Sequence, residues 1–293
     1  AFNSLGTAIA PVIGALFLLS DTVKSADEIG SLTETERIAY YANEAAAVQN
    51  PFLIITAFIV VLAIVFSFVK LPDLMRHNEH GNYKQAFKHK GLMMGALGIF
   101  VYVGAEVAIG SYLVNYFIDM NMHVIILETA WMHNLASGIL NTDIGSLDKR
   151  AIVGAFVTFY WSGAMVGRFI GSYLTMIFAP SRVLSIFAVG SLLFIFLSMH
   201  TAGLISMWSI LGVGLFNSIM FPTIFTLSIQ DVGDLKPQAS GILCTMIVGG
   251  AVVPPLYGFF TDISGFKSAL WLLIACYGYI VYFGYYCGSS EDK

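Results

Sequence analysis

Residues 92–118 read LMMGALGIFVYVGAEVAIGSYLVNYFI, an apolar run that contains a single charge, Glu106. A helix needs about 20 mostly apolar residues to cross the hydrocarbon core of a bilayer, and this run is long enough. A lone strand or loop at that depth would leave its backbone polar groups without hydrogen-bond partners. We therefore predict a membrane-spanning helix over these residues.

The same reasoning predicts eight spans in all. They cover residues 1–20, 51–70, 92–118, 151–178, 181–199, 203–229, 239–260 and 266–287. Of the 293 residues 57% are hydrophobic and 11% charged, and the mean hydropathy is +0.79. A soluble domain carries about 25% charged residues, so the composition excludes a water-soluble globule. A net charge of −4 offers no basic surface for nucleic acid. The predicted class is an all-α integral membrane protein in a lipid bilayer.

Basic residues predict the orientation of these spans. With eight spans both chain ends lie on one side, together with the loop at 71–91. Nine of the 14 lysines and arginines fall on that side. Basic residues favour the cytoplasmic side, so we predict cytoplasmic ends. The long loops at 21–50 and 119–149 then face outward. A capping pattern at Thr33 and Glu36 predicts a surface helix in the first, and the second resembles a partly helical lid. A solvated connector is the simpler interpretation of both loops.

An internal repeat indicates the architecture. The pattern G-x4-P-x2-G runs from Gly6 to Gly14 in the first span and from Gly250 to Gly258 in the seventh. Repeated halves with helices interrupted by glycine and proline are typical of secondary transporters. A period of six spans implies a complete protein of twelve helices. We therefore expect this chain, which begins at Ala1, to be a fragment that lacks four helices in front.

Glu106 is the one acidic residue placed in the middle of a predicted span. A buried carboxylate needs a cavity, a partner or a proton. Two interpretations follow: Glu106 binds a sugar hydroxyl or a coupling ion, or it makes a hydrogen bond between helices. Tyr102 lies four residues earlier and shares the same helical face.

Asn217 and Pro222 lie in the sixth span, in GLFNSIMFPTIF. The proline is expected to kink the helix and to free a backbone carbonyl. An amide beside a kink suits sugar hydroxyls, but it suits polar contacts between helices equally well.

The fourth span reads FYWSGAMVGRFIGSYL. Gly163, Gly167 and Gly171 form a GxxxGxxxG face that predicts close helix packing. Arg168 at the end of the span is either a gate residue or an interfacial anchor.

Aromatic and flexible positions complete the candidate site. Tyr160 and Trp161 either stack against a sugar ring or simply pack against other helices. In the seventh span, Gly249-Gly250 and Pro254-Pro255 predict a flexible, kinked helix that can act as a hinge. No nucleotide-binding loop, HExxH motif or G-x-S-x-G elbow occurs. The three histidines at 77, 80 and 89 are interpreted as a solvated loop. We therefore expect no catalytic residue, no metal and no cofactor.

Five segments together resemble a known family. They are AFNSLGTAIAP, GAEVAIGSYLVNYF, FVTFYWSGAMVGRFIGSYL, GLFNSIMFPTIFTLSI and ASGILCTMIVGGAVVPPLYGFFTD. The chain resembles the fucose permease-like branch of the major facilitator superfamily, and within it looks most like bacterial glucose/galactose transporters. The similarity covers nearly the whole chain.

The resemblance implies helices five to twelve of a twelve-helix fold with two bundles, alternating access and a central sugar cavity. Residues 1–70 would be the last two helices of the first bundle and 71–91 the cytoplasmic loop between bundles. Residues 92–287 would be the second bundle and 288–293 a cytoplasmic tail. Glu106 then belongs to helix seven, Tyr160, Trp161 and Arg168 to helix eight, and Asn217 to helix ten.

The implied function is cation-coupled uptake of a hexose, such as glucose, galactose or fucose, by a monomer in the bacterial inner membrane. The family's coupling acids lie in helices one and four, which this chain lacks. Proton coupling is the default for the branch, and sodium coupling is the second candidate. Two rival functions are an eight-helix membrane enzyme acting on a lipid-type substrate and a non-transporting sugar sensor on the same fold.

Overall fold

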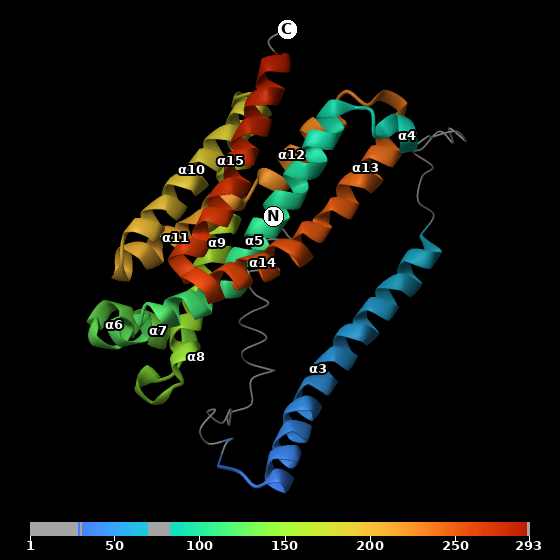
Figure 1. The fold of residues 1–293 in the computed structure, drawn as a ribbon. Helices are drawn as coiled ribbons and strands as arrows, with labels where there is room; N and C mark the ends of the chain where they lie inside the picture. The colour runs from blue at the N-terminus through green and yellow to red at the C-terminus, as the bar shows by residue number, and fades with distance from the viewer. Residues whose placement is uncertain (1–28, 30, 70–82, 292–293) are drawn as a thin grey trace. The chain divides into compact units, whose positions relative to one another are not determined.

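The computed structural model describes residues 29, 31–69 and 83–291, and this described part contains helices and connecting turns (Figure 1). It divides into two compact units, one containing α3 and the other containing α4 to α15. The elements are α3 (Glu34–Phe68), α4 (Tyr83–Ala86), α5 (Lys90–Asp119), α6 (Met122–Glu128), α7 (Ala130–Leu140), η1 (Ile144–Ser146), α8 (Lys149–Gly154), α9 (Val157–Ile177), α10 (Pro180–His200), α11 (Gly203–Asn217), α12 (Met220–Ile229), η2 (Gly233–Leu235), α13 (Lys236–Thr245), η3 (Met246–Val248), α14 (Gly249–Ser264) and α15 (Phe266–Glu291).

Within the described residues, seven helical segments are long and apolar enough to cross a membrane. They are Pro51–Phe68, Lys90–Asp119, Lys149–Ile177, Pro180–His200, Gly203–Ile229, Gly233–Ser264 and Phe266–Ser289. Each corresponds to one of the eight predicted spans, while the first predicted span, at 1–20, lies outside the described residues. The prediction of an all-helical membrane fold is confirmed.

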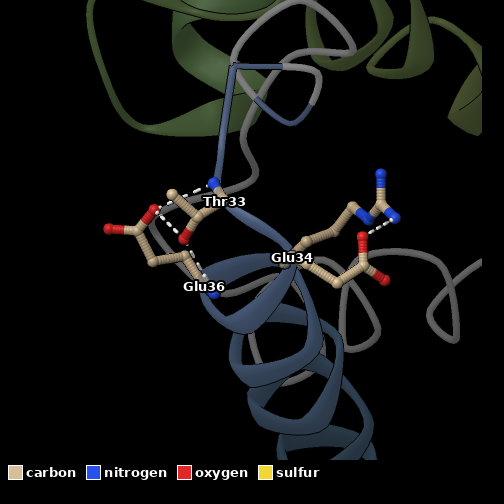
Figure 2. Close-up of polar contacts among 4 residues, drawn as sticks. Thr33, Glu34 and Glu36 are labelled. Atoms are coloured by element: carbon tan, nitrogen blue, oxygen red, sulfur yellow. Dashed lines mark hydrogen bonds and ion pairs between the residues drawn. The ribbon is translucent and has the colours of Figure 1, made fainter.

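Helix α3 begins with the predicted capping box (Figure 2). The Thr33 hydroxyl accepts a hydrogen bond from the Glu36 backbone N–H at 3.4 Å, and the Glu36 carboxylate accepts one from the Thr33 N–H at 3.0 Å. These two bonds satisfy backbone donors that have no partner inside the helix. Arg37 and Glu34 add an ion pair on the exposed surface.

The prediction of a separate surface helix before the 51–70 span is wrong. One continuous helix runs from Glu34 to Phe68 and passes through Pro51. Residues 34–50 are rich in alanine and glutamate, which favour helix, and they contain neither glycine nor an internal proline. Pro51 removes one backbone donor, but the residues on both sides hold the helix together through their own bonds.

The second unit is built around α5. Helix α5 packs against α12, α14 and α15, while α9 packs on α11, and α10 packs on both α11 and α15 (Figure 1). Small residues allow the closest approach. Any side chain at Gly167 would collide with the Leu215 backbone, and one at Gly171 would collide with Ile219. The predicted close-packing face of α9 is therefore confirmed, and α11 is the helix that it contacts.

Residues 119–149 are partly helical, as predicted, and contain α6, α7 and η1. The two helices gather with α8 at one end of the unit (Figure 1). The Trp131 ring of α7 stacks on Trp208 of α11 with centroids 6.2 Å apart, and Trp208 meets Phe159 edge to face at 5.3 Å. These aromatic contacts hold the segment against the bundle. Its function as a lid stays a prediction.

Two predicted spans are interrupted. The 203–229 span is divided into α11 and α12 by a turn at Ser218 and Ile219. The 239–260 span is interrupted by η3, which ends immediately before Gly249. Both prolines of that span, Pro254 and Pro255, lie inside α14, and the helix continues through them. The kink therefore falls before the glycine pair rather than at the prolines.

Candidate functional site

Glu106 lies midway along α5, within a group of tyrosines. Tyr102 precedes it by one helical turn, and its hydroxyl is within hydrogen-bonding range of the Glu106 carboxylate, as the spacing predicts. The charge of Glu106 also acts on Tyr160 of α9 and Tyr277 of α15. Glu106 is partly exposed, whereas these three tyrosines are buried. The carboxylate thus stands at the edge of a buried phenolic cluster.

The interruption between α11 and α12 supplies backbone acceptors to this cluster. In a continuous helix the Ser218 carbonyl would accept from residue 222, but Pro222 has no N–H. The side chain of Arg168 replaces that donor, with Nε 3.1 Å from the Ser218 oxygen. The neighbouring carbonyl of Asn217 accepts a hydrogen bond from the Tyr102 hydroxyl at 2.9 Å. The predicted link between Pro222, a helix kink and a freed carbonyl is therefore confirmed.

The Asn217 side chain connects two more helices. Its Nδ2 donates to the Tyr160 hydroxyl at 2.7 Å, and its Oδ1 accepts from the Tyr277 hydroxyl at 2.7 Å. Asn217 is fully buried, so these bonds offset the cost of placing an amide in the core. The cluster of Tyr102, Glu106, Tyr160, Asn217 and Tyr277 joins α5, α9, α11 and α15, and we call it the tyrosine cluster.

Trp161 lies next to the tyrosine cluster. Its ring meets Tyr160 edge to face, with centroids 5.0 Å apart. The other end of the ring lies against Gly110, where an added side-chain carbon would be 3.1 Å from Cζ2. Gly110 is one turn beyond Glu106 on α5, so the carboxylate and the indole are neighbours along that helix. Trp161, like Glu106, is only partly buried.

The predicted residues therefore fall into two groups. The tyrosine cluster, Trp161 and Arg168 surround Glu106. The glycine pair of α14 lies elsewhere along α5: a side chain at Gly249 would collide with the Phe100 carbonyl, and one at Gly250 would press on Val103 and Val107. Gly249 and Gly250 thus allow α14 to approach α5 closely.

Tyr277 was missed by the sequence interpretation. It lies in CYGYIVYFGYY, where five tyrosines occur close together in one apolar run. Nothing in that run distinguishes the tyrosine that reaches Asn217 from the others. Only the packing of α15 in the bundle identifies it.

The arrangement suits binding of a neutral polar ligand. Glu106 offers a carboxylate acceptor, the phenols offer both donors and acceptors, and Trp161 offers an aromatic face. Within residues 29, 31–69 and 83–291, no group of three or more His, Cys, Asp or Glu side chains is placed to hold a metal ion.

Comparison with known proteins identifies the relatives of this chain. It is 39% identical over 287 residues to a glucose/galactose transporter of Brucella abortus biovar 1 (strain 9-941), covering 97% of this chain and 61% of that protein. It is 38% identical over 299 residues to a putative glucose/galactose transporter of Helicobacter pylori (strain J99), covering 100% of this chain and 65% of that protein. The L-fucose-proton symporter of Escherichia coli (strain K12) is 28% identical over 278 residues, covering 90% and 57%.

A solved structure agrees with these sequence relatives. The crystal structure of a major facilitator superfamily transporter, FucP, in the outward conformation matches with a TM-score of 0.72 and 26% identity over 98% of this chain and 66% of that one. No protein-family model matches the chain. The chain spans about 61–65% of the length of the two glucose/galactose transporters. All these relatives are transporters rather than enzymes.

Proposed function

We infer the function of this chain from its family: it belongs to the major facilitator superfamily, in the branch that is like the fucose:proton symporter. We propose that it is part of a transporter that carries a hexose, glucose or galactose, across the bacterial inner membrane by alternating access. One observation carries the proposal: a single carboxylate, Glu106, stands halfway along a spanning helix, backed by buried hydroxyl and amide groups. Intramembrane carboxylates of this kind mark substrate or ion pathways.

The chemistry of a hexose matches the partly exposed edge of the site. A sugar hydroxyl can donate a hydrogen bond to the Glu106 carboxylate. The C–H face of a pyranose ring is apolar and can stack on the Trp161 indole. Tyr102, Tyr160 and Asn217 support Glu106 from the buried side. In this proposal the sugar contacts Glu106 and Trp161 first.

The proposed transport cycle assigns roles to the interrupted helices. Arg168 holds the Ser218 carbonyl at the interruption next to Pro222, and its charge lies within range of Glu106. We assign Arg168 to a gate whose contacts change between the two access states, with Gly167 packed at the same interruption. Gly249 and Gly250 follow the η3 turn, and with Pro254 and Pro255 they form the proposed hinge of α14.

The remaining family features are part of the same proposal. Residues 1–70 would end a first bundle, 71–91 would connect the bundles in the cytoplasm, 92–287 would form the second bundle, and 288–293 would be a tail. Both chain ends would then be cytoplasmic, and the transporter would act as a monomer. The coupling ion is proposed to be a proton because one relative is an L-fucose-proton symporter; sodium is the alternative.

Ion coupling gives a direct test of this function. The full-length gene product is reconstituted in proteoliposomes and supplied with labelled galactose or glucose. We expect an inward proton gradient to drive accumulation above the external concentration, and a proton-conducting ionophore to abolish it. Accumulation driven only by a sodium gradient would change the assigned ion. Absence of uptake with either gradient would contradict the proposed function, provided that the protein elutes as a folded species in detergent.

A further inference from the structure

Asn217 has its polar side-chain atoms and its carbonyl occupied by tyrosines. Tyr160 and Tyr277 bind the two ends of its amide, and Tyr102 binds its backbone oxygen. The exposed fraction is 0% for Asn217, Tyr160 and Tyr277. A sugar that reaches Glu106 therefore meets no free group of Asn217. The residue most suggestive of a sugar ligand in the sequence is enclosed by the protein.

The amide of Asn217 also fixes the direction of the hydrogen bonds around it. Nδ2 can only donate and Oδ1 can only accept, so Tyr277 spends its proton on Oδ1 and Tyr160 receives a proton from Nδ2. The hydroxyl hydrogen of Tyr160 is then directed away from Asn217. Glu106 is the charged group that acts on Tyr160, and a carboxylate is the strongest acceptor for such a hydrogen.

We propose that Asn217 is a positioning residue that holds the Glu106 carboxylate in place through Tyr160 and Tyr102, and that Tyr277 fixes the orientation of the Asn217 amide. The proposal rests on the proposed function in one respect only, the assignment of Glu106 as the sugar contact. Asn217 itself touches no sugar. Its effect on sugar affinity passes through the carboxylate of Glu106.

Packing alone gives a competing account of the same contacts. A buried asparagine that bonds to two helices also stabilises a bundle in the absence of any ligand. The two accounts differ in what happens when Glu106 no longer carries a charge. Removal of Asn217 affects sugar affinity through Glu106 in the first account and independently of Glu106 in the second.

A double-mutant cycle separates the two accounts. Asn217→Leu and Glu106→Gln are made singly and together in the full-length gene product, and galactose binding is measured at equilibrium. We expect Asn217→Leu to weaken binding roughly ten-fold in the wild-type background, the value of one hydrogen bond to a charged group. In the Glu106→Gln background the same substitution is expected to change binding less than two-fold. Tyr160→Phe is expected to reproduce Asn217→Leu, and the two together to add nothing.

A chemical probe of Glu106 tests the proposal without any sugar. Dicyclohexylcarbodiimide reacts with apolar-site carboxyl groups, which add across one of its C=N bonds, and mass spectrometry locates the product. We expect Asn217→Leu and Tyr160→Phe to change the rate of labelling at Glu106 roughly ten-fold, because the carboxylate loses hydroxyl partners. Thr223→Val is the matched control. Thr223 is also buried, but it bonds only to the Ile219 carbonyl of its own segment, so labelling should stay at the wild-type rate.

Each outcome decides one point. An equal loss of binding in both Glu106 backgrounds would overturn the positioning role, as would unchanged labelling of Glu106 in Asn217→Leu. Wild-type protein that binds neither glucose nor galactose would instead contradict the proposed function. In that case the labelling rates still decide whether Asn217 acts on Glu106.

Discussion

Replacing Glu106 with glutamine is expected to lower galactose counterflow by the full-length gene product roughly 10- to 100-fold. Hydrogen bonds to a charged group are worth about 1.5–3 kcal/mol, against about 1 kcal/mol for neutral partners, so the amide keeps the shape but loses most of the binding strength. Abundance in the membrane should be unchanged, because glutamine can still accept a hydrogen bond from the Tyr102 hydroxyl. Counterflow is measured in proteoliposomes at equal protein content.

Glu128→Gln is the matched control for that measurement. Glu128 ends the short helix α6 and is exposed, so its conversion to glutamine should leave counterflow at the wild-type rate. Wild-type counterflow in Glu106→Gln would remove Glu106 from the sugar site. A parallel loss in both variants would show that the effect comes from charge in general rather than from the tyrosine cluster.

Gly167→Ala is expected to damage the fold more than any other single methyl group added to α9. A side-chain carbon at this position would collide with the Leu215 carbonyl and the Ser218 hydroxyl, at the place where α9 crosses the interruption between α11 and α12. Overpacking of this kind costs about 1–3 kcal/mol or more, since backbone atoms cannot rotate away. We expect a lower midpoint of thermal unfolding in detergent and a reduced yield of folded protein.

Gly278→Ala provides the comparison for Gly167→Ala. Gly278 lies inside α15, and an added side-chain carbon there meets nothing within 4 Å. Alanine at such a position favours helix by about 0.5–1 kcal/mol relative to glycine, so the unfolding midpoint should be unchanged or higher. Equal destabilisation by the two substitutions would contradict the assignment of Gly167 as the close contact between α9 and α11.

Much of the fold follows from local sequence patterns. Apolar runs long enough to cross a bilayer predict each described span, because hydrocarbon leaves the backbone no alternative to helix. Pro222 predicts the interruption at Ser218, because the missing N–H acts four residues away. Helix α3 was predicted less well: its capping box is local and was found, but the pattern does not show that the helix continues through Pro51.

The candidate site is only partly predictable for a related reason. Glu106 stands out because a charge in an apolar run is rare, and Tyr102 follows from helical spacing. Tyr277 and the bond from Arg168 to the Ser218 carbonyl depend on contacts between distant helices. No local pattern encodes those contacts, and the enclosure of Asn217 by tyrosines appears only in the packed bundle.

The central claim is that this chain belongs to a protein that moves a hexose across a membrane, and sugar counterflow tests it most directly. Proteoliposomes containing the full-length gene product are loaded with unlabelled galactose and diluted into labelled galactose, with no ion gradient. The account predicts a transient accumulation of label that is absent from protein-free liposomes. Galactose binding without any such exchange would contradict transport and indicate a sugar sensor built on the same fold.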